Sequence, residues 1–319
     1  MWATIGAAVA FIAYILRSSP SDIGLAPLLD MYRALLRSRT GFGEWIGMLD
    51  NHAIAAVSSD EVEMHIQSLP ARWCADASSP LSLAVVLALF DEVSTMGLMQ
   101  HDKSHRAGVS VLLAGAVDKN ERDRFDGLTA GSAAKLTVRS RSRRIGRTLG
   151  FCDVTLSVDG VVVVRGEHVK FMPVGGRIWD VAFGSALYAW AVPLVTWLLK
   201  RRRRRSAAAP GADASAFAAV FPSNADGAFA VQKTHHNVSG VCHGGAVAIA
   251  AAEAARRALA PRRRVRRARA LRVVYLSASK GALDIATELA GEGEARTVVR
   301  RVARGGKMVE CATVVSSWE

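Results

Sequence analysis

The feature that most constrains the fold is one order of elements that occurs twice along the chain. In the first copy a strand-like run at 62–69 precedes an apolar stretch at 81–98. Its apolar residues recur every four positions, which predicts a largely buried helix: Leu81, Val85, Leu89 and Val93. Four strand-like segments follow, at 108–117, 132–140, 147–158 and 161–171. The pair Asp159-Gly160 between the last two is a hairpin signal.

The second copy repeats the order with little similarity of individual residues. A strand-like run at 228–234 precedes an Ala-rich helix predicted over 243–259. Strand-like segments then follow at 270–277, 282–290, 295–302 and 307–316. The whole chain is therefore predicted to be α+β, with two units at 58–175 and 223–319 that each pack a sheet against one central helix.

Two apolar segments lie outside these units. Residues 1–57 contain an apolar run at 2–16 and two predicted short helices around a turn at 41–43. The linker, 176–222, contains an uncharged run at 181–199 that is just long enough to cross a bilayer, followed by six basic residues. A true crossing would separate the two units, and both basic flanks favour the cytosolic side. We therefore expect attachment to a membrane surface, a re-entrant segment or a buried linker helix.

Composition narrows the possible partners and the compartment. The formal net charge of +13 is concentrated in the runs 200–205 and 256–272, which suit anionic headgroups, the phosphates of a ligand or simply solvent. Aromatic residues do not interleave with these runs, so a nucleic-acid partner is not expected. The cysteines lack metal-ligand spacing, which predicts free thiols on the reducing, intracellular side and no metal site: Cys74, Cys152, Cys242 and Cys311.

The sharpest local motif is the nine-residue turn 237–245, Asn-Val-Ser-Gly-Val-Cys-His-Gly-Gly, which runs directly into the second predicted helix. A helix start leaves backbone N–H groups unpaired at the positive end of the helix dipole. The glycine pair lets a ligand approach that backbone closely. Such a start suits a carbonyl oxygen that becomes an oxyanion.

The spacing Asn-x-x-Gly-x-x-His-Gly-Gly before a small-residue helix resembles the signature of hotdog-fold acyl-CoA thioesterases of the phenylacetate-pathway type. The resemblance implies two tandem hotdog units that pair as an intramolecular pseudo-dimer, with further homo-oligomers left open. It also implies an acyl-CoA substrate and no cofactor. In that family one unit supplies the Asn and the His-Gly-Gly turn, and its partner supplies an acidic residue nine positions after its own equivalent of the His.

Each unit of this chain carries only part of that pattern. The second unit matches at five positions, Asn237, Gly240, His243, Gly244 and Gly245. Nine residues after His243 stands Ala252, which has no acid–base chemistry, and the adjacent Glu253 is turned by about 100° around the helix. The first unit has Ser82 in place of the His and carries Asp91 nine residues later. The resemblance thus implies one composite site, with its counterpart empty.

The implied roles follow the family, and each has a structural alternative. Asp91 acts as general base or nucleophile, or forms a salt bridge; Gly244 and Gly245 donate to the oxyanion, or only start a helix. His243 and Gly240 shape the turn and bind substrate.

Asn237 orients the water or thioester, or caps the turn. The hydroxyl of Thr95 forms a hydrogen bond with the carboxylate or the water, or is a core hydroxyl whose hydrogen bonds are made within the protein. Glu92 is expected to face solvent or to be structural.

Three functions are therefore compatible with the sequence. The first is an acyl-CoA thioesterase, in which the run 256–272 meets the coenzyme A phosphates. The second is a catalytically silent, membrane-associated acyl-CoA binder or scaffold, favoured by the incomplete repeats and apolar inserts. The third is a hotdog hydratase or dehydratase, which usually carries Asp and His close together in one sequence motif. No such motif is present.

Overall fold

The computed structural model describes residues 25–26, 29–30, 32–33, 41–48, 53–75, 78–102, 106, 108–172, 217–221, 227–237, 240–261 and 267–319. The predicted apolar segments 2–16 and 181–199 and the basic run 200–205 lie outside these residues. The predictions of membrane attachment therefore stay predictions.

The first unit consists of a long central helix and six strands. Helix α4, Leu83–His101, begins at Ser82, whose side chain accepts a hydrogen bond from the N–H of Ala84. The strands are β1 (Ala53–Ala56), β2 (Glu61–Ile66), β3 (Val109–Val117), β4 (Leu136–Ile145), β5 (Leu149–Val158) and β6 (Val161–Phe171). Short helices complete it: α3 (Phe42–Trp45), η2 (Ala71–Trp73), η3 (Lys119–Glu121) and α5 (Arg122–Asp126). At the predicted hairpin, Asp159 and Gly160 both have positive φ, as a type I′ turn requires.

The second unit repeats this plan with one strand fewer before its central helix. That helix, α9, spans Gly244–Leu259. Its strands are β7 (Ala228–Ala230), β8 (Ala268–Tyr275), β9 (Ala282–Leu289), β10 (Glu294–Val302) and β11 (Met308–Trp318). The short helices are α8 (Phe217–Val220), η5 (Lys233–His235) and η6 (Arg304–Gly306). The predicted element order is confirmed in both units.

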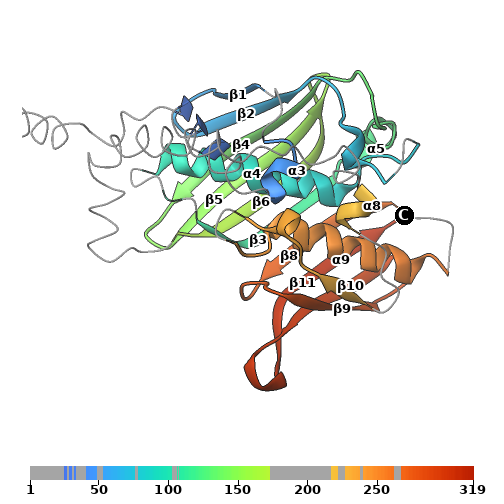
Figure 1. Cartoon of the computed structure of the whole chain (residues 1–319). Helices are drawn as coiled ribbons and strands as arrows, with labels where there is room; N and C mark the ends of the chain where they lie inside the picture. The colour runs from blue at the N-terminus through green and yellow to red at the C-terminus, as the bar shows by residue number, and fades with distance from the viewer. Residues whose placement is uncertain are drawn as a thin grey trace, which may run out of the picture.

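The described strands form one antiparallel sheet in the order β1-β2-β4-β5-β6-β3-β8-β11-β10-β9-β7. The two units join where β3 pairs with β8, with Gly115 opposite Leu271. Both central helices lie on the same face of this sheet and contact each other (Figure 1). This arrangement is the predicted pair of tandem hotdog units, side by side within one chain.

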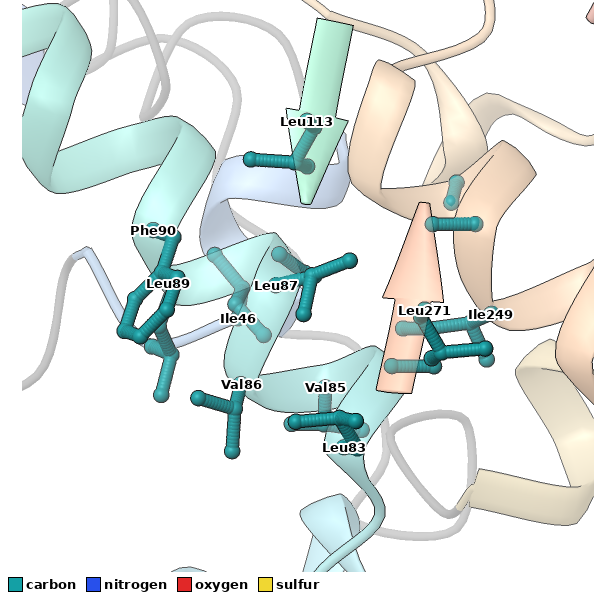
Figure 2. Close-up of a cluster of buried hydrophobic side chains, with 14 of the residues drawn as sticks. Ile46, Leu83, Val85, Val86, Leu87, Leu89, Phe90, Leu113, Ile249 and Leu271 are labelled. Atoms are coloured by element: carbon teal, nitrogen blue, oxygen red, sulfur yellow. The ribbon is translucent and has the colours of Figure 1, made fainter. Parts of the chain in front are cut away.

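The core lies between the two helices and the centre of the sheet. Figure 2 shows side chains of α4 meeting Leu113 of β3, Leu271 of β8 and Ile249 of α9. All of these are buried. Of the helices in the described residues, α4 alone is long and apolar enough to cross a membrane, but it is buried on almost every side. It is therefore the core helix of the sheet, and helices buried all round are expected to be apolar all round.

The N-terminal region differs in two places from the prediction of helices around a turn. Residues 53–56 form strand β1, which pairs with β2 from Ala53 opposite His65 to Ala56 opposite Val62. The predicted turn at 41–43 instead starts the short helix α3. Phe42 and Trp45 of that helix are buried against Phe221, so aromatic packing determines the conformation there.

Candidate active site

The two central helices begin in the same way, which tests the correspondence inferred from the sequence. Ser82 is the N-cap of α4, and His243 is the N-cap of α9. The positions nine residues later are Asp91 and Ala252, and both are buried within their helices. The two units therefore carry different chemistry at equivalent places.

The carboxylate of Asp91 lies directly in front of the start of α9. A Cβ atom placed on Gly244 would be 3.0 Å from Oδ2 of Asp91. The same oxygen is 3.5 Å from Nδ1 of His243. The pairing of the units thus brings the acidic residue of the first unit to the His-Gly-Gly turn of the second.

The other carboxylate oxygen of Asp91 is held by the strands of its own unit. Oδ1 accepts a hydrogen bond from the hydroxyl of Ser110 on β3 at 3.0 Å and lies 3.2 Å from Nζ of Lys170 on β6. Lys170 is buried, and the side chain of Asp91 is 3% exposed. Oδ1 is therefore anchored, whereas Oδ2 faces the helix start.

His168 of β6 continues the hydrogen-bond network that holds Oδ1 of Asp91. Its Nε2 is 3.0 Å from the hydroxyl of Ser110, and its Nδ1 is 2.5 Å from the hydroxyl of Ser94. Burial lowers the pKa of His168 to about 3, so the ring is neutral at physiological pH. His168 thus acts as a neutral hydrogen-bonding partner of Ser110.

Asp91 is ionised at neutral pH despite its burial. Burial alone raises the pKa of a carboxyl group. The cation of Lys170, joined by His243 when its ring is protonated, outweighs that effect and holds the pKa of Asp91 well below its usual range. An ionised carboxylate with one unanchored oxygen can accept a proton from water or attack a carbonyl carbon.

The two glycines of the turn have different surroundings. The N–H of Gly245 donates to Nδ1 of His243 at 3.0 Å, and a Cβ on Gly245 would be 2.6 Å from that of Ala88 on α4. Gly245 is thus required at this contact between the two helices. Within the described part of the chain, the N–H of Gly244 has no hydrogen-bond acceptor. Gly244 is partly exposed, and its carbonyl accepts from the hydroxyl of Tyr275 at 2.8 Å.

The remaining predicted site residues have local bonding roles. The Asn237 side chain accepts from the N–H of Val241 at 3.2 Å, and the N–H of Asn237 donates to the Val241 carbonyl at 2.7 Å. Gly240 closes this turn with φ of +75°, a conformation that favours glycine. The hydroxyl of Thr95 donates to the main-chain carbonyl of Asp91 at 2.6 Å, so that proton is not directed at the carboxylate.

Five residues around the carboxylate were not predicted as site residues: Glu92, Ser110, His168, Lys170 and Tyr275. His168 and Lys170 stand two apart on β6, so they share its inward face. Two inward polar residues on a strand otherwise apolar on that face are a sequence signal for a buried polar cluster. Glu92, expected to face solvent or to be structural, is 1% exposed because α4 is buried on nearly every side.

Three arginines of the basic run at 256–272 form ion pairs within the protein: Arg256, Arg267 and Arg269. Arg269 makes a bidentate pair with Asp126 of the first unit, and Arg267 pairs with the same carboxylate. Arg256 pairs with Glu253. The pairs of Arg267 and Arg269 with Asp126 join the two units, whereas the Arg256 pair lies within α9. Among the described residues, no group of three or more His, Cys, Asp or Glu side chains is placed to hold a metal ion.

Replacing Lys170 by Met tests the anchor of Asp91. The variant leaves a buried carboxylate with one cation fewer, and breaking a buried ion pair costs about 3–5 kcal/mol. We expect the free energy of unfolding in urea at pH 7 to fall on that scale. The pKa of Asp91 is lowered on folding, so its stabilisation is present above the unfolded pKa of about 3.9 and is lost as the pH falls. The difference in unfolding free energy between the wild type and Lys170→Met should therefore become smaller as the pH falls. An equal deficit in Lys280→Met, at an exposed lysine, would contradict this account.

Comparison with known proteins identifies the fold. No protein-family model and no curated protein matches the chain. The structure is similar to that of an acyl-ACP thioesterase from Bacteroides thetaiotaomicron, with 10% identity and a TM-score of 0.52 over 81% of this chain and 98% of the other. It is also similar to the 12:0-ACP thioesterase from Umbellularia californica, with 10% identity and a TM-score of 0.51 over 83% and 99% of the two chains. At these identities the likeness establishes the fold, and the chain is a tandem hotdog protein with the fold of these thioesterases.

Proposed function

We propose that this chain is a thioesterase that hydrolyses acyl-CoA thioesters at one composite site. The observation that carries the proposal is the position of Asp91 Oδ2, which lies 3.0 Å from where a Cβ of Gly244 would stand. A carboxylate therefore lies in front of a helix start whose first N–H is unpaired in the described structure. These are the two parts that hydrolysis of a thioester needs, a group that activates water and a donor for the oxyanion.

The reaction uses residues of both units. The thioester carbonyl oxygen accepts from the N–H of Gly244, where the dipole of α9 favours developing negative charge. The N–H of Gly245 is bound to His243, which leaves Gly244 as the better oxyanion donor of the pair. As general base, Asp91 takes a proton from water while the water oxygen bonds to the carbonyl carbon. The tetrahedral oxyanion then re-forms the carbonyl, the C–S bond breaks, and the departing thiolate receives that proton.

A nucleophilic route remains equally compatible with the geometry. In it Oδ2 of Asp91 bonds to the carbonyl carbon, the thiolate leaves, and water hydrolyses the resulting anhydride. Single turnover in ¹⁸O-labelled water, together with trapping of the anhydride by hydroxylamine, separates the two. Attack of water on the Asp91 carboxyl carbon of the anhydride places the label in Asp91 and leaves the released acid unlabelled, whereas the base route labels the acid and leaves the protein unlabelled. Attack of water on the acyl carbon of the anhydride also labels only the acid, and in that case a trapped acyl-enzyme identifies the nucleophilic route.

The counterpart site of the pseudo-dimer lacks this chemistry. Ser82 replaces the His-Gly-Gly start, and Ala252 stands where the first unit has Asp91. Ala252 is buried and carries no proton-transfer group. We therefore assign one working site to each chain.

The proposed activity is tested by assaying free-thiol release from a panel of acyl-CoAs of different chain lengths, beside the same acyl groups on acyl carrier protein. We expect turnover of at least one acyl-CoA, and the panel reports the preferred chain length. If only the thioesters on acyl carrier protein are hydrolysed, these are the substrates and the proposed acyl-CoA specificity is wrong. Binding of acyl-CoAs without release of thiol would support the silent binder and would overturn the proposed activity.

One observation favours a hydratase or dehydratase as second candidate. Such enzymes use an Asp and a His together, and the fold brings Asp91 Oδ2 within 3.5 Å of His243 Nδ1, although 152 positions in numbering separate them. Incubation with an enoyl-CoA distinguishes the two activities. Loss of the conjugated double bond with the thioester intact indicates hydration, and release of thiol indicates hydrolysis.

A further inference from the structure

Glu92 is a second buried carboxylate at the site, and the proposed hydrolysis does not use it. Its Oε2 accepts a hydrogen bond from the hydroxyl of Tyr32 at 2.7 Å, and its Oε1 lies 3.2 Å from Nε2 of His243. Oε1 has no aligned hydrogen-bond donor within the described structure. The His243 ring is thus the polar group that faces this oxygen of a carboxylate that is 1% exposed. A buried carboxylate is costly without such a partner.

The bond made by the other ring nitrogen specifies where the proton of His243 lies. Nδ1 accepts a hydrogen bond from the N–H of Gly245 at 3.0 Å. A ring nitrogen that accepts a hydrogen bond carries no proton, so the neutral ring has its proton on Nε2. That nitrogen faces Glu92. Phe42 stacks on the same ring, with centroids 4.8 Å apart, and restricts its rotation.

We propose that Glu92 is a positioning residue for the thioesterase site: it holds His243 with the proton on Nε2, so that Nδ1 caps the N–H of Gly245. This inference rests on the proposed function for its catalytic meaning. The cap fixes the first turn of α9 and leaves the N–H of Gly244 as the donor for the substrate. Tyr32, from the N-terminal region outside both hotdog units, holds the opposite oxygen of Glu92 and so supports the site from a third part of the chain.

Protonation of His243 disrupts this arrangement. A proton on Nδ1 removes the acceptor for Gly245 and points at Oδ2 of Asp91, 3.5 Å away. The oxygen that activates water is then paired with a cation. The active form of the site therefore has neutral His243, and activity falls as the pH drops through the pKa of that ring.

Charges on several elements set that pKa. Burial lowers the pKa of His243, but the carboxylates of Asp91 and Glu92 on α4 outweigh burial and raise it above 6.5, against the opposing charge of Lys170 on β6. The other titratable groups at the site are neutral or distant at this pH: His168 on β6, Tyr275 on β8 and Tyr32 in the N-terminal region. Removal of the Glu92 charge therefore lowers the pKa of His243.

The test combines a pH–activity profile with a spectroscopic readout in Glu92→Gln. Gln is nearly isosteric and retains an acceptor for Tyr32, but it removes the charge. We expect the acid limb of kcat/KM to move toward lower pH by about one unit. Glu253→Gln, which removes an ion-paired carboxylate from α9, should leave the limb in place. An unchanged limb in Glu92→Gln with normal folding would overturn the proposal.

Nitrogen-15 labelling of histidine makes the test independent of activity. In the full-length wild type, the His243 ring, assigned by its loss in His243→Gln, should have its proton on Nε2 at high pH and titrate above 6.5. In Glu92→Gln the same ring should titrate at lower pH. A titration that does not move would contradict the role of Glu92 even if the chain releases no thiol. A shifted titration in a chain without turnover would instead sustain the role of Glu92 and reject only the proposed activity.

Discussion

Replacing Asp91 by Asn should lower kcat/KM for thioester hydrolysis by about 10²–10⁴-fold, the range typical of a lost general base. Asn has nearly the same shape and can still accept a hydrogen bond from Ser110 through Oδ1. It has no basic oxygen to present to water in front of Gly244. The loss should be larger still if Asp91 acts as nucleophile, because the covalent route is then closed.

The matched control for this variant is Glu253→Gln. Glu253 is the carboxylate next to Ala252, the position in α9 equivalent to Asp91 in α4, and it pairs with Arg256 instead of facing a helix start. We expect its activity to stay within a factor of about two of the wild type. Far-ultraviolet circular dichroism should show the same secondary structure in all three proteins. Equal losses in the two variants, or full activity of Asp91→Asn, would contradict the composite site.

The second large effect is expected on stability, in Gly245→Ala. The added Cβ would lie 2.6 Å from Cβ and 2.9 Å from Cα of Ala88, so helices α4 and α9 must move apart. Overpacking of a well-packed interior typically costs about 1–3 kcal/mol, and main-chain contact places this site at the upper end. A lower urea midpoint with an unchanged m-value would measure this loss directly.

Gly244→Ala is the matched control because the adjacent position has different neighbours. Its Cβ would lie 3.0 Å from Oδ2 of Asp91 and 3.2 Å from the Tyr275 hydroxyl, both of them side-chain atoms that can shift by a few tenths of an ångström. We expect a smaller loss of stability than in Gly245→Ala. The methyl group occupies the space between carboxylate and substrate, so turnover should fall by about 10²-fold or more. The reverse order of stability losses would show that the assignment of the two glycines is wrong.

The fold was largely predictable because each unit carries its own local signals. The four-residue apolar period of α4, the Asp159-Gly160 hairpin and the Ala-rich start of α9 each determine an element within a few residues. The fixed interval of nine residues from each helix cap also placed Asp91 and Ala252 at equivalent positions. The first unit lacks the His-Gly-Gly turn and the second lacks the carboxylate, so pairing of the two units could be inferred.

The surroundings of Asp91 were not predictable because they depend on pairing between distant strands. Ser110 and Lys170 stand opposite each other in the β3–β6 register, and that register includes an irregularity just after Ser110. No short-range pattern specifies such a register. The burial of Glu92 was missed for a different reason. The residue that follows a core position on a helix usually faces solvent. Here that side of α4 is covered by Tyr32 of the N-terminal region and by His243 of the second unit.

The most direct test of the central claim, one composite site in each chain, is a crystal structure of the full chain with a non-hydrolysable acyl-CoA analogue whose thioester is replaced by a ketone. We expect one analogue per chain, with its carbonyl oxygen on the N–H of Gly244 and its carbonyl carbon facing Asp91 Oδ2. Binding of the reactive group beside Ser82 and Ala252, or equivalent occupancy at both ends of the pseudo-dimer, would contradict it.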